Sequence, residues 1–418
     1  MQRFFNPKTI AVIGASRTPG KLGYELVKNL KRYRGGKVYE VNPNMKYKSI
    51  TDIKDKIDLV AIIVKAEMVP QIVDECGIKG VKNIIIFTGG FKEAGHPDLQ
   101  NKIVEYAAKY NMKIIGPNVN GIYDAHSGLD CMYMIPERLS RPKAGSISLI
   151  SQSGTIGIWF LEWAYKNNFG VSKYISYGNR CVVKEYELIN YLNNDPNTKI
   201  IALYMEGGID GEEIYKAISR CNKPIIIFRC GQTWKERGNN AVFNHIGCNL
   251  GRYQTDVTNS CHNLGAIMVN SIEQFFAAIK ALMMQPKSKG KIVNMITNGA
   301  GPLVQILNMS EPIGLGALDL QLKDLVGSAT VYDYEYDIRH LVNSDLCVVY
   351  INWETSWSSI EEKLLIKEIL GARQPLICMM YDKPYSKKFI KELENGGVPV
   401  FNTPQEVAAA MVALCSSR

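Results

Sequence analysis

The chain has 418 residues, of which 46% are apolar and 21% charged, and its net charge is +9. At roughly 150 residues per domain this length suggests about three domains, and the composition excludes wholesale disorder. No two of the ten cysteines have CxxC spacing, which disfavours a zinc site and favours free thiols in the cytoplasm. The first residues lack the apolar core of a signal peptide, and the longest aliphatic run, 59–64, is too short to cross a membrane. The chain has no long block of like charges, so the sequence does not indicate a nucleic-acid partner.

Residues 1–125 show an alternation of apolar runs and amphipathic stretches. The expected strands are 9–14, 37–41, 58–64, 83–87 and 112–115, and the expected helices are 21–32, 68–80 and 98–110. Continuous apolar strands separated by helices are typical of a parallel sheet that is covered on both faces. The first block is therefore predicted to be a doubly wound α/β domain.

The same alternation returns after a loop-like stretch that contains Pro136, Pro142 and Gly145. A second block, 146–284, and a third block, 291–418, are separated by a linker at 285–290. The expected strands are 146–150, 172–176, 199–203 and 224–228 in the second block, and 291–296, 346–350 and 375–379 in the third. The predicted fold class is α/β, with three doubly wound parallel-sheet domains.

Three of the predicted strands run into small-residue turns that open helices, at 14–23, 151–157 and 297–301. Glycine lets backbone amides approach a ligand, and the free amides at a helix N-terminus favour anions. Three such turns in one chain favour a nucleotide-like ligand. The first turn is not GxGxxG and no Walker A motif occurs, which disfavours a nicotinamide dehydrogenase and P-loop phosphoryl transfer.

One of the five histidines, His245, lies in a loop with Gly247 and Gly251 close behind it. A histidine nitrogen is able to attack a phosphoryl group, provided that amides bind the phosphate oxygens and a carboxylate orients the ring. Glu206, just after the neighbouring strand 199–203, is a candidate for that carboxylate. On the residues alone, a loop histidine is more often structural than catalytic, so a structural role for His245 stays open.

Further motifs follow one another along the chain. In order they are Gly14-Ala15-Ser16, Pro19-Gly20-Lys21-Leu22-Gly23-Tyr24, Val41-Asn42-Pro43, Gly89-Gly90-Phe91, Gly116-Pro117-Asn118, Ser151-Gln152-Ser153-Gly154-Thr155, Gly178-Asn179 and Asp195-Pro196-Asn197-Thr198-Lys199. With this succession the chain resembles the α subunit of NDP-forming acyl-CoA synthetases, also called ADP-forming acetyl-CoA synthetases. It is similar, more distantly, to the succinyl-CoA synthetase α subunit.

The resemblance implies a Rossmann-like CoA-binding domain over 1–125, followed by two flavodoxin-like domains of the succinyl-CoA synthetase type. The second domain, 146–284, would carry a phosphohistidine, and the third, 291–418, would be a ligase-CoA-like domain. The implied CoA-binding residues are Gly14, Ala15, Ser16, Pro19, Gly20, Lys21, Leu22, Asn42 and Pro43.

Within the second domain the resemblance implies that His245 becomes phosphorylated and that Glu206 steadies it. The implied phosphate-binding residues are Ser153, Gly154, Thr155 and Gly247. Asn179 would contact the substrate, and no metal is expected on this chain.

The implied reaction interconverts acyl-CoA, phosphate and a nucleoside diphosphate with a carboxylic acid, CoA and the triphosphate, through an acyl phosphate and a phosphohistidine. The sequence shows no ATP-grasp module. The resemblance therefore implies a separate ATP-grasp β subunit that binds NDP or NTP with Mg²⁺, in an α2β2-like hetero-oligomer.

The chain departs from the family pattern around the histidine, at Asn244, Ile246 and Asn249. Arg180 stands where the family carries an aspartate, and Asn44 where a lysine is common. These departures motivate an alternative, a CoA- or acyl-CoA-binding subunit of a larger complex that has lost phosphoryl transfer.

Overall fold

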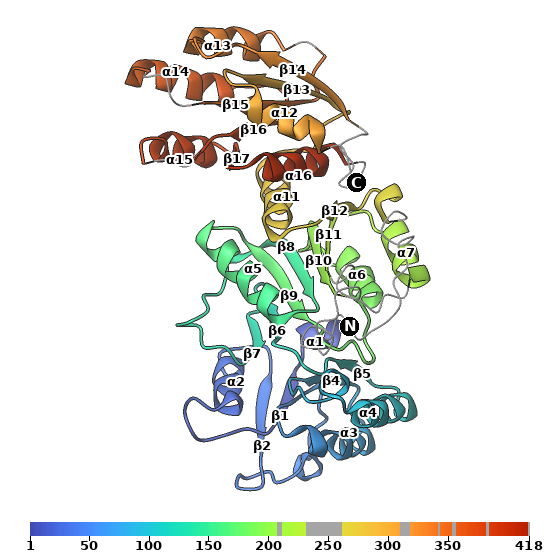
Figure 1. The fold of residues 1–418 in the computed structure, drawn as a ribbon. Coiled ribbons are helices and arrows are strands. Elements are labelled where there is room, and N and C mark those ends of the chain that lie inside the picture. Colours follow the sequence, from blue (N-terminus) through green and yellow to red (C-terminus); the bar gives the residue numbers. More distant parts are fainter. Residues whose placement is uncertain are drawn as a thin grey trace. The chain divides into compact units, whose positions relative to one another are not determined.

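The computed structural model describes residues 1–206, 211–230, 261–309, 318–341, 343–352, 357–381 and 384–416 (Figure 1). Its strands form three mostly parallel sheets that alternate with helices along the chain, which confirms the predicted α/β class. The described residues fall into two compact units. The first holds those up to 225 together with 229–230, and the second holds 226–228 and those from 261 onward.

The first sheet has the strand order β2-β1-β3-β4-β5, and all its pairs are parallel. Its strands are β1 (Thr9–Ile13), β2 (Lys37–Val41), β3 (Leu59–Ile62), β4 (Asn83–Ile86) and β5 (Lys113–Ile115). The helices are α1 (Gln2–Phe5), α2 (Leu22–Leu30), α3 (Val69–Ile78) and α4 (Pro97–Lys109), with short 3-10 turns at Ile50–Asp52, Ala66–Met68 and Lys92–Ala94. Each predicted strand and helix of this block is present.

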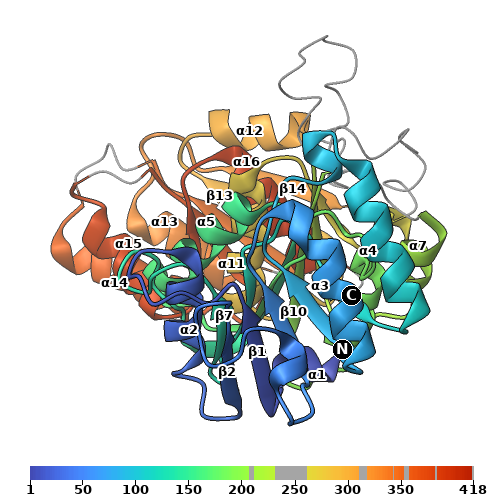
Figure 2. The same ribbon diagram turned by 90° about the horizontal axis from the view of Figure 1, so that it is seen from below.

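Apolar burial explains how this sheet is covered. Helices α3 and α4 lie side by side (Figure 2), and their Val73 and Ile103 share a core with Ile62 of β3. Helix α2 packs on β1 and β2 and buries Leu26 and Leu30 completely. Burying such a side chain stabilises the fold by about 1.5–3 kcal/mol, so the helices are fixed on the sheet by their apolar faces.

Five further strands of the first unit follow the order β10-β8-β9-β6-β7. They are β6 (Gly121–Asp124), β7 (Leu129–Met132), β8 (Ala144–Ser151), β9 (Val171–Ser176) and β10 (Ile200–Met205). The accompanying helices are α5 (Gly154–Lys166), α6 (Glu185–Asn193) and α7 (Gly211–Ser219). Strands β8 to β10 are parallel, as the sequence predicted, whereas β6 pairs antiparallel with both β7 and β9.

The second unit includes residues 226–228 of β11 (Ile225–Arg229), which pair in parallel with β12 (Ile267–Val269), and continues with α11 (Ile272–Met284). Its own sheet has the order β14-β13-β15-β16-β17, the same order as the first sheet. The strands are β13 (Ile292–Thr297), β14 (Asp319–Asp324), β15 (Leu346–Tyr350), β16 (Leu376–Met379) and β17 (Val400–Phe401). The helices are α12 (Gly301–Asn308), α13 (Val331–Arg339), α14 (Ser359–Leu370), α15 (Lys387–Asn395) and α16 (Pro404–Cys415).

One core of this unit joins α13, α14 and α15 to one face of the sheet, through residues such as Tyr334, Leu365 and Phe389. Helix α16 packs against α11 and α12. Helices on both faces make this sheet doubly wound as well.

The nine cysteines among the described residues are free thiols, and all except Cys230 are buried. Burial raises the pKa of several of these thiols, to about 12 in the case of Cys181. Across the described ranges, no helix is long and apolar enough to span a bilayer. Within the same ranges, no cluster of three or more His, Cys, Asp or Glu side chains is arranged to hold a metal ion.

Candidate active site

A cavity of ≈ 980 Å³ opens beside the carboxyl ends of β1, β3 and β4. Strands β2 and β3 lie on opposite sides of β1, so the chain reverses its winding direction here. In open α/β sheets this switch point is where ligands bind. The fold therefore places a ligand-sized space at the first glycine-rich turn.

Two glycines bring this turn close to the sheet. Gly14 has φ +96°, and a Cβ atom at this position would lie 2.2 Å from the carbonyl oxygen of Ile63. A Cβ atom on Gly23, in the first turn of α2, would lie 2.0 Å from the carbonyl oxygen of Gly14. No other residue fits at either position, so strand, turn and helix pack closely beside the cavity.

The cavity brings together seven of the nine predicted CoA-binding residues: Gly14, Ala15, Ser16, Gly20, Lys21, Leu22 and Asn42. Asn42 also fixes the turn, because its Nδ2 donates to the carbonyl of Ala15 at 2.9 Å and its Oδ1 accepts from the amide of Asn44 at 3.0 Å. Pro43 lines a smaller cavity, and Pro19 is exposed beside the turn.

The smaller cavity, of ≈ 370 Å³, shares Gly14, Asn42 and Val64 with the larger one. Apolar residues such as Ile72 and Met68 form much of its wall. Its polar lining includes Lys48, Ser49, Gln71 and Glu75, and Ser49 Oγ donates to Glu75 Oε2 at 3.1 Å. An apolar slot with a few polar groups suits a nucleobase.

Lysines contribute the positive charge of this region. Lys21 and Lys65 line the larger cavity and Lys48 lines the smaller. Lys46, two residues after Asn44, has its Nζ 5.3 Å from the ring centroid of Tyr47. Ammonium groups and backbone amides around one space favour a ligand that carries phosphates.

The second glycine-rich turn begins α5. Ser153 caps the helix, since its Oγ accepts from the amide of Ile156 at 3.4 Å, and Ser151 Oγ donates to the carbonyl of Ser153 at 2.6 Å. Gly154 and Thr155 occupy the first two helical positions, where amides have no partner within the helix. The predicted phosphate-binding residues Ser153, Gly154 and Thr155 thus form the N-terminus of α5.

Glu206, the predicted catalytic carboxylate, is buried just after β10. Its Oε1 accepts a hydrogen bond from the hydroxyl of Tyr204 at 3.0 Å. Its backbone amide donates to Gln152 Oε1 at 2.9 Å, and the Gln152 amide donates to the Tyr204 carbonyl at 3.1 Å. These bonds hold the carboxylate beside the turn that precedes α5.

The side-chain amide nitrogen of Gln152 is a buried donor that is available to a ligand. The side chain is 1% exposed, and its Nε2 has no hydrogen-bond partner within the described ranges. Gln152 belongs to the second glycine-rich motif, and the motif alone predicts no role for it. Its position in the sequence, between the end of a strand and a serine-rich turn, is the signal that could have identified it as a site residue.

Asn179 was predicted to contact substrate, and the structure places it, buried, in the loop after β9. Its Nδ2 donates to Glu93 Oε2 and, at 3.0 Å, to Gln100 Oε1, while its Oδ1 has no partner among the residues described. Glu93 Oε1 accepts from the amide of Gly90 at 2.7 Å. The amide end of Asn179 is thus used inside the protein, and only its oxygen is left for a ligand.

Arg180, which replaces the family's aspartate, has φ +51° and is buried. Its Nε and Nη2 donate to the two carboxylate oxygens of Glu185 at 2.9 and 2.8 Å. Glu185 is the first residue of α6, where a negative charge is favourable. The departure from the family pattern is therefore compensated by a bidentate ion pair.

The third turn, 297–301, uses its polar groups in hydrogen bonds within the protein. Asn298 Nδ2 donates to the carbonyl of Asn352 at 3.0 Å, and the amide of Asn352 donates to Asn298 Oδ1 at 2.8 Å. The amide of Gly299 donates to Thr297 Oγ1 at 2.8 Å. These bonds favour a packing role for this turn.

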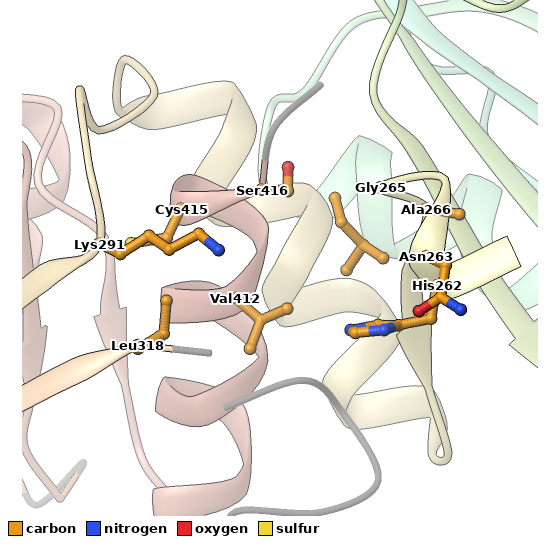
Figure 3. A pocket seen from close by; sticks show the side chains of 10 residues that line it. His262, Asn263, Gly265, Ala266, Lys291, Leu318, Val412, Cys415 and Ser416 are labelled. Carbon is orange, nitrogen blue, oxygen red and sulfur yellow. The ribbon is translucent and has the colours of Figure 1, made fainter. Parts of the chain in front are cut away.

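The second unit has a separate cavity of ≈ 230 Å³ (Figure 3), lined by residues that include His262, Lys291, Val412 and Cys415. None of the predicted site residues that the structure describes lines this cavity. Close to Cys415, Lys287 Nζ donates to the carbonyl and the hydroxyl of Ser416, at 3.1 and 2.9 Å, beyond the end of α16. Burial, partly offset by the Cys415 thiol, lowers the pKa of Lys287 to about 8.

The predicted phosphoryl carrier His245 and its neighbour Gly247 lie outside the described residues, as do Asn244, Ile246 and Asn249. Their roles remain predictions.

Two family models match the chain: a CoA binding domain over residues 8–124 and a succinyl-CoA ligase like flavodoxin domain over residues 144–282. The α subunit of ADP-forming acetate–CoA ligase II from Pyrococcus furiosus is 34% identical over 451 residues, covering 98% of this chain and 96% of that protein. An ADP-forming acetate–CoA ligase from Methanocaldococcus jannaschii is 39% identical over 306 residues, and the match spans 42% of its length.

Among solved structures, the acetyl-coenzyme A synthetase 1 of Ca. Korarchaeum cryptofilum, in complex with phosphate and ADP, superposes with a TM-score of 0.77. It is 28% identical, and the match covers 99% of this chain and 96% of that one. With identity above 30% along nearly the full length of a relative, the chain belongs to the family of ADP-forming acetate–CoA ligase α subunits.

Proposed function

We propose that the chain is the α-type subunit of an NDP-forming acyl-CoA synthetase, which interconverts acyl-CoA, phosphate and NDP with a carboxylic acid, CoA and NTP. The observation that carries this proposal is the cavity at the first turn. Seven residues named from the sequence line it, and it lies at the switch point of the sheet. The names of the relatives, which are acetate–CoA ligases, support an acyl group as the group that is joined to CoA.

CoA fits the lining of the two joined cavities. The phosphates would contact Lys21, Lys65 and the amides of the turn, which supply positive charge and donors. The adenine would enter the slot lined by Lys48, Gln71 and Pro43. The pantetheine arm would then point past Asn118 towards α5.

For the phosphoryl half of the reaction, we propose that phosphate binds at the N-terminus of α5, on Ser153, Gly154 and Thr155, with Gly247. His245 would accept the phosphoryl group from the acyl phosphate. Glu206, held by Tyr204 and Gln152, would orient and charge-balance the ring. The unpartnered Oδ1 of Asn179 would accept a hydrogen bond from the substrate side.

We further propose the domain limits 1–125, 146–284 and 291–418, a cytoplasmic location, and an ATP-grasp β subunit that binds NDP or NTP with Mg²⁺ in an α2β2-like assembly. The names of the relatives support a partner subunit. The P. furiosus protein, which this chain matches along its length, is called a subunit, whereas the longer M. jannaschii protein is not called one.

The test is phosphorylation of the chain mixed with its partner subunit, Mg²⁺ and γ-labelled ATP. We expect an acid-labile, base-stable label in the wild type and none in His245→Ala. His262→Ala, at a described histidine that lines the separate cavity of the second unit, is the matched control and should keep the label. Label that persists in His245→Ala would refute His245 as the carrier.

The second candidate function is a CoA-binding subunit without phosphoryl transfer, which the changes at Asn244, Ile246 and Asn249 favour. Calorimetry separates the two: CoA binding without any label on the chain would support this alternative. If CoA does not bind at all, both functions fail.

A further inference from the structure

Asn120 lies between Tyr133, which lines the large cavity, and Gly154, the first residue of α5. Its Oδ1 accepts a hydrogen bond from the hydroxyl of Tyr133 at 2.9 Å, and Tyr133 lines the cavity. On the other side its carboxamide packs against Gly154: a Cβ atom on Gly154 would lie 2.4 Å from Asn120 Nδ2. One side chain therefore contacts both a cavity-lining residue and the first residue of α5.

The hydrogen bond from Tyr133 sets the orientation of this carboxamide. Because a phenol hydroxyl donates to the amide oxygen, the NH2 group of Asn120 must lie on the opposite side. The Tyr133 ring packs edge-on against Phe87, with centroids 6.1 Å apart, and the Asn120 backbone amide donates to Ser176 Oγ at 3.2 Å. Both ends of the contact are thus supported by buried neighbours.

The NH2 group of Asn120 is a donor without an assignment. In the part of the chain that the structure describes, no acceptor engages Nδ2. It lies beside the amides of the first turn of α5, which also lack partners within the helix. Donors from a loop side chain and from a helix N-terminus are therefore close together, next to Tyr133, which lines the cavity.

We propose that Asn120 Nδ2 is a catalytic donor to the acyl carbonyl oxygen while the acyl group passes between CoA sulfur and phosphate, an inference that rests on the proposed function. In that step a phosphate oxygen attacks the thioester carbon, a C–O bond forms, and the carbonyl oxygen becomes an oxyanion. The C–S bond then breaks, CoA leaves as a thiolate, and the proton lost by phosphate goes to the thiolate or to solvent. Tyr133 is a positioning residue that acts through Asn120.

A fixed donor stabilises this oxyanion more than the ground-state carbonyl, because negative charge develops on the oxygen only as the transition state is approached. Removing one such donor typically lowers kcat by about 10²–10³-fold. The glycine at 154 is what lets the carboxamide approach, since any side chain there would overlap it.

The experiment measures phosphate-dependent release of the CoA thiol from acetyl-CoA, with the full chain alone and together with its partner subunit. Asn120→Asp keeps the shape of the side chain and removes the donor. We expect its kcat to fall about 10²–10³-fold, with the Kd for CoA within about twofold of wild type. Tyr133→Phe keeps the ring but frees the carboxamide, and should lower kcat by about tenfold, with little change in Kd. Asn101→Asp, at an exposed position of α4, is the matched control and should leave both kcat and Kd at their wild-type values.

The outcomes separate this inference from the proposed function. Wild-type activity together with an unchanged kcat in Asn120→Asp overturns the role of Asn120 alone. A parallel loss of CoA binding and of thermal stability in both variants makes the pair structural and also overturns it. A wild type that binds CoA without releasing thiol in the presence of phosphate refutes the proposed function, and the inference with it.

Discussion

The carbonyl oxygen of Gly14 lies so close to α2 that a Cβ atom on Gly23 would sit 2.0 Å from it. The overlap involves backbone on both sides, so a flexible side chain cannot relieve it. The spacing of strand, turn and helix beside the cavity depends on this contact.

Gly23→Ala should therefore push α2 away from the turn and weaken CoA binding by about tenfold or more, with a loss of stability of about 1–3 kcal/mol. Calorimetry with CoA and chemical denaturation measure the two effects. Gly301→Ala is the control, because a Cβ atom there meets no atom within 4 Å. Wild-type CoA affinity in Gly23→Ala would contradict this account of the turn.

The Arg180–Glu185 pair leads to a second prediction. Arg180→Met alone leaves the buried Glu185 carboxylate without its partner and should cost about 3–5 kcal/mol. The double variant Arg180→Met/Glu185→Leu removes both charges and should recover much of that loss. Thermal unfolding of the two single variants and the double variant completes the cycle. Additive losses would show that the pair does not act as a unit.

A buried network at the start of β9 leads to a third prediction. Lys173 Nζ lies 2.8 Å from Asp195 Oδ2 and 3.6 Å from Asp124 Oδ2, and all three side chains are at most 7% exposed. Lys173→Met should cost about 3–5 kcal/mol, since two carboxylates lose their cation. Lys388→Met, at an 83% exposed side chain, should change stability by less than about 1 kcal/mol.

The same network sets a pH dependence. Burial raises the pKa of Asp195, but hydrogen bonds from Lys173 and Thr198 outweigh it, so the pKa lies below its ordinary value. A lowered carboxyl pKa stabilises the fold at neutral pH, and this contribution is lost as pH falls below about 4. Urea titrations from pH 7 to pH 3 should show a shallower acid-side slope in Lys173→Met than in wild type.

Lys287 provides a fourth prediction. Its pKa of about 8, against an ordinary 10.5, leaves a large neutral fraction at pH 8. Acetic anhydride at pH 8 should therefore modify Lys287 faster than the exposed Lys388, as measured by mass spectrometry over time. The unfolded chain binds the proton up to about 10.5 and the folded chain only to about 8, so this group adds stability as pH rises between those values. Equal labelling rates for the two lysines would contradict the lowered pKa.

Buried apolar runs made several central strands predictable, because β1, β3, β4 and β10 consist mostly of consecutive apolar residues. The hairpin β6–β7 was not predicted. Its strands carry Asp124 and Asp130, whose charges are matched by Lys173 and Arg141 from elsewhere in the chain. Strand β14 was also missed, although Leu320 and Leu322 alternate with polar residues, a signal for a half-exposed edge strand.

The CoA cavity was largely predictable because its turn residues are neighbours in sequence. Asn120 and Gln152 were not assigned, since their roles depend on contacts with Tyr133 and Glu206 that the fold brings together. Pairings of this kind have no local sequence pattern.

The burial of the cysteines has a practical consequence for assays. A thiol reagent must reach the thiolate, and eight of the nine described cysteines are buried, leaving only Cys230 partly accessible. Burial raises the pKa of Cys230 as well. A chromogenic disulfide added to the native chain should therefore report free CoA over a low background from the described cysteines, so thiol release can be followed continuously without first removing any of them.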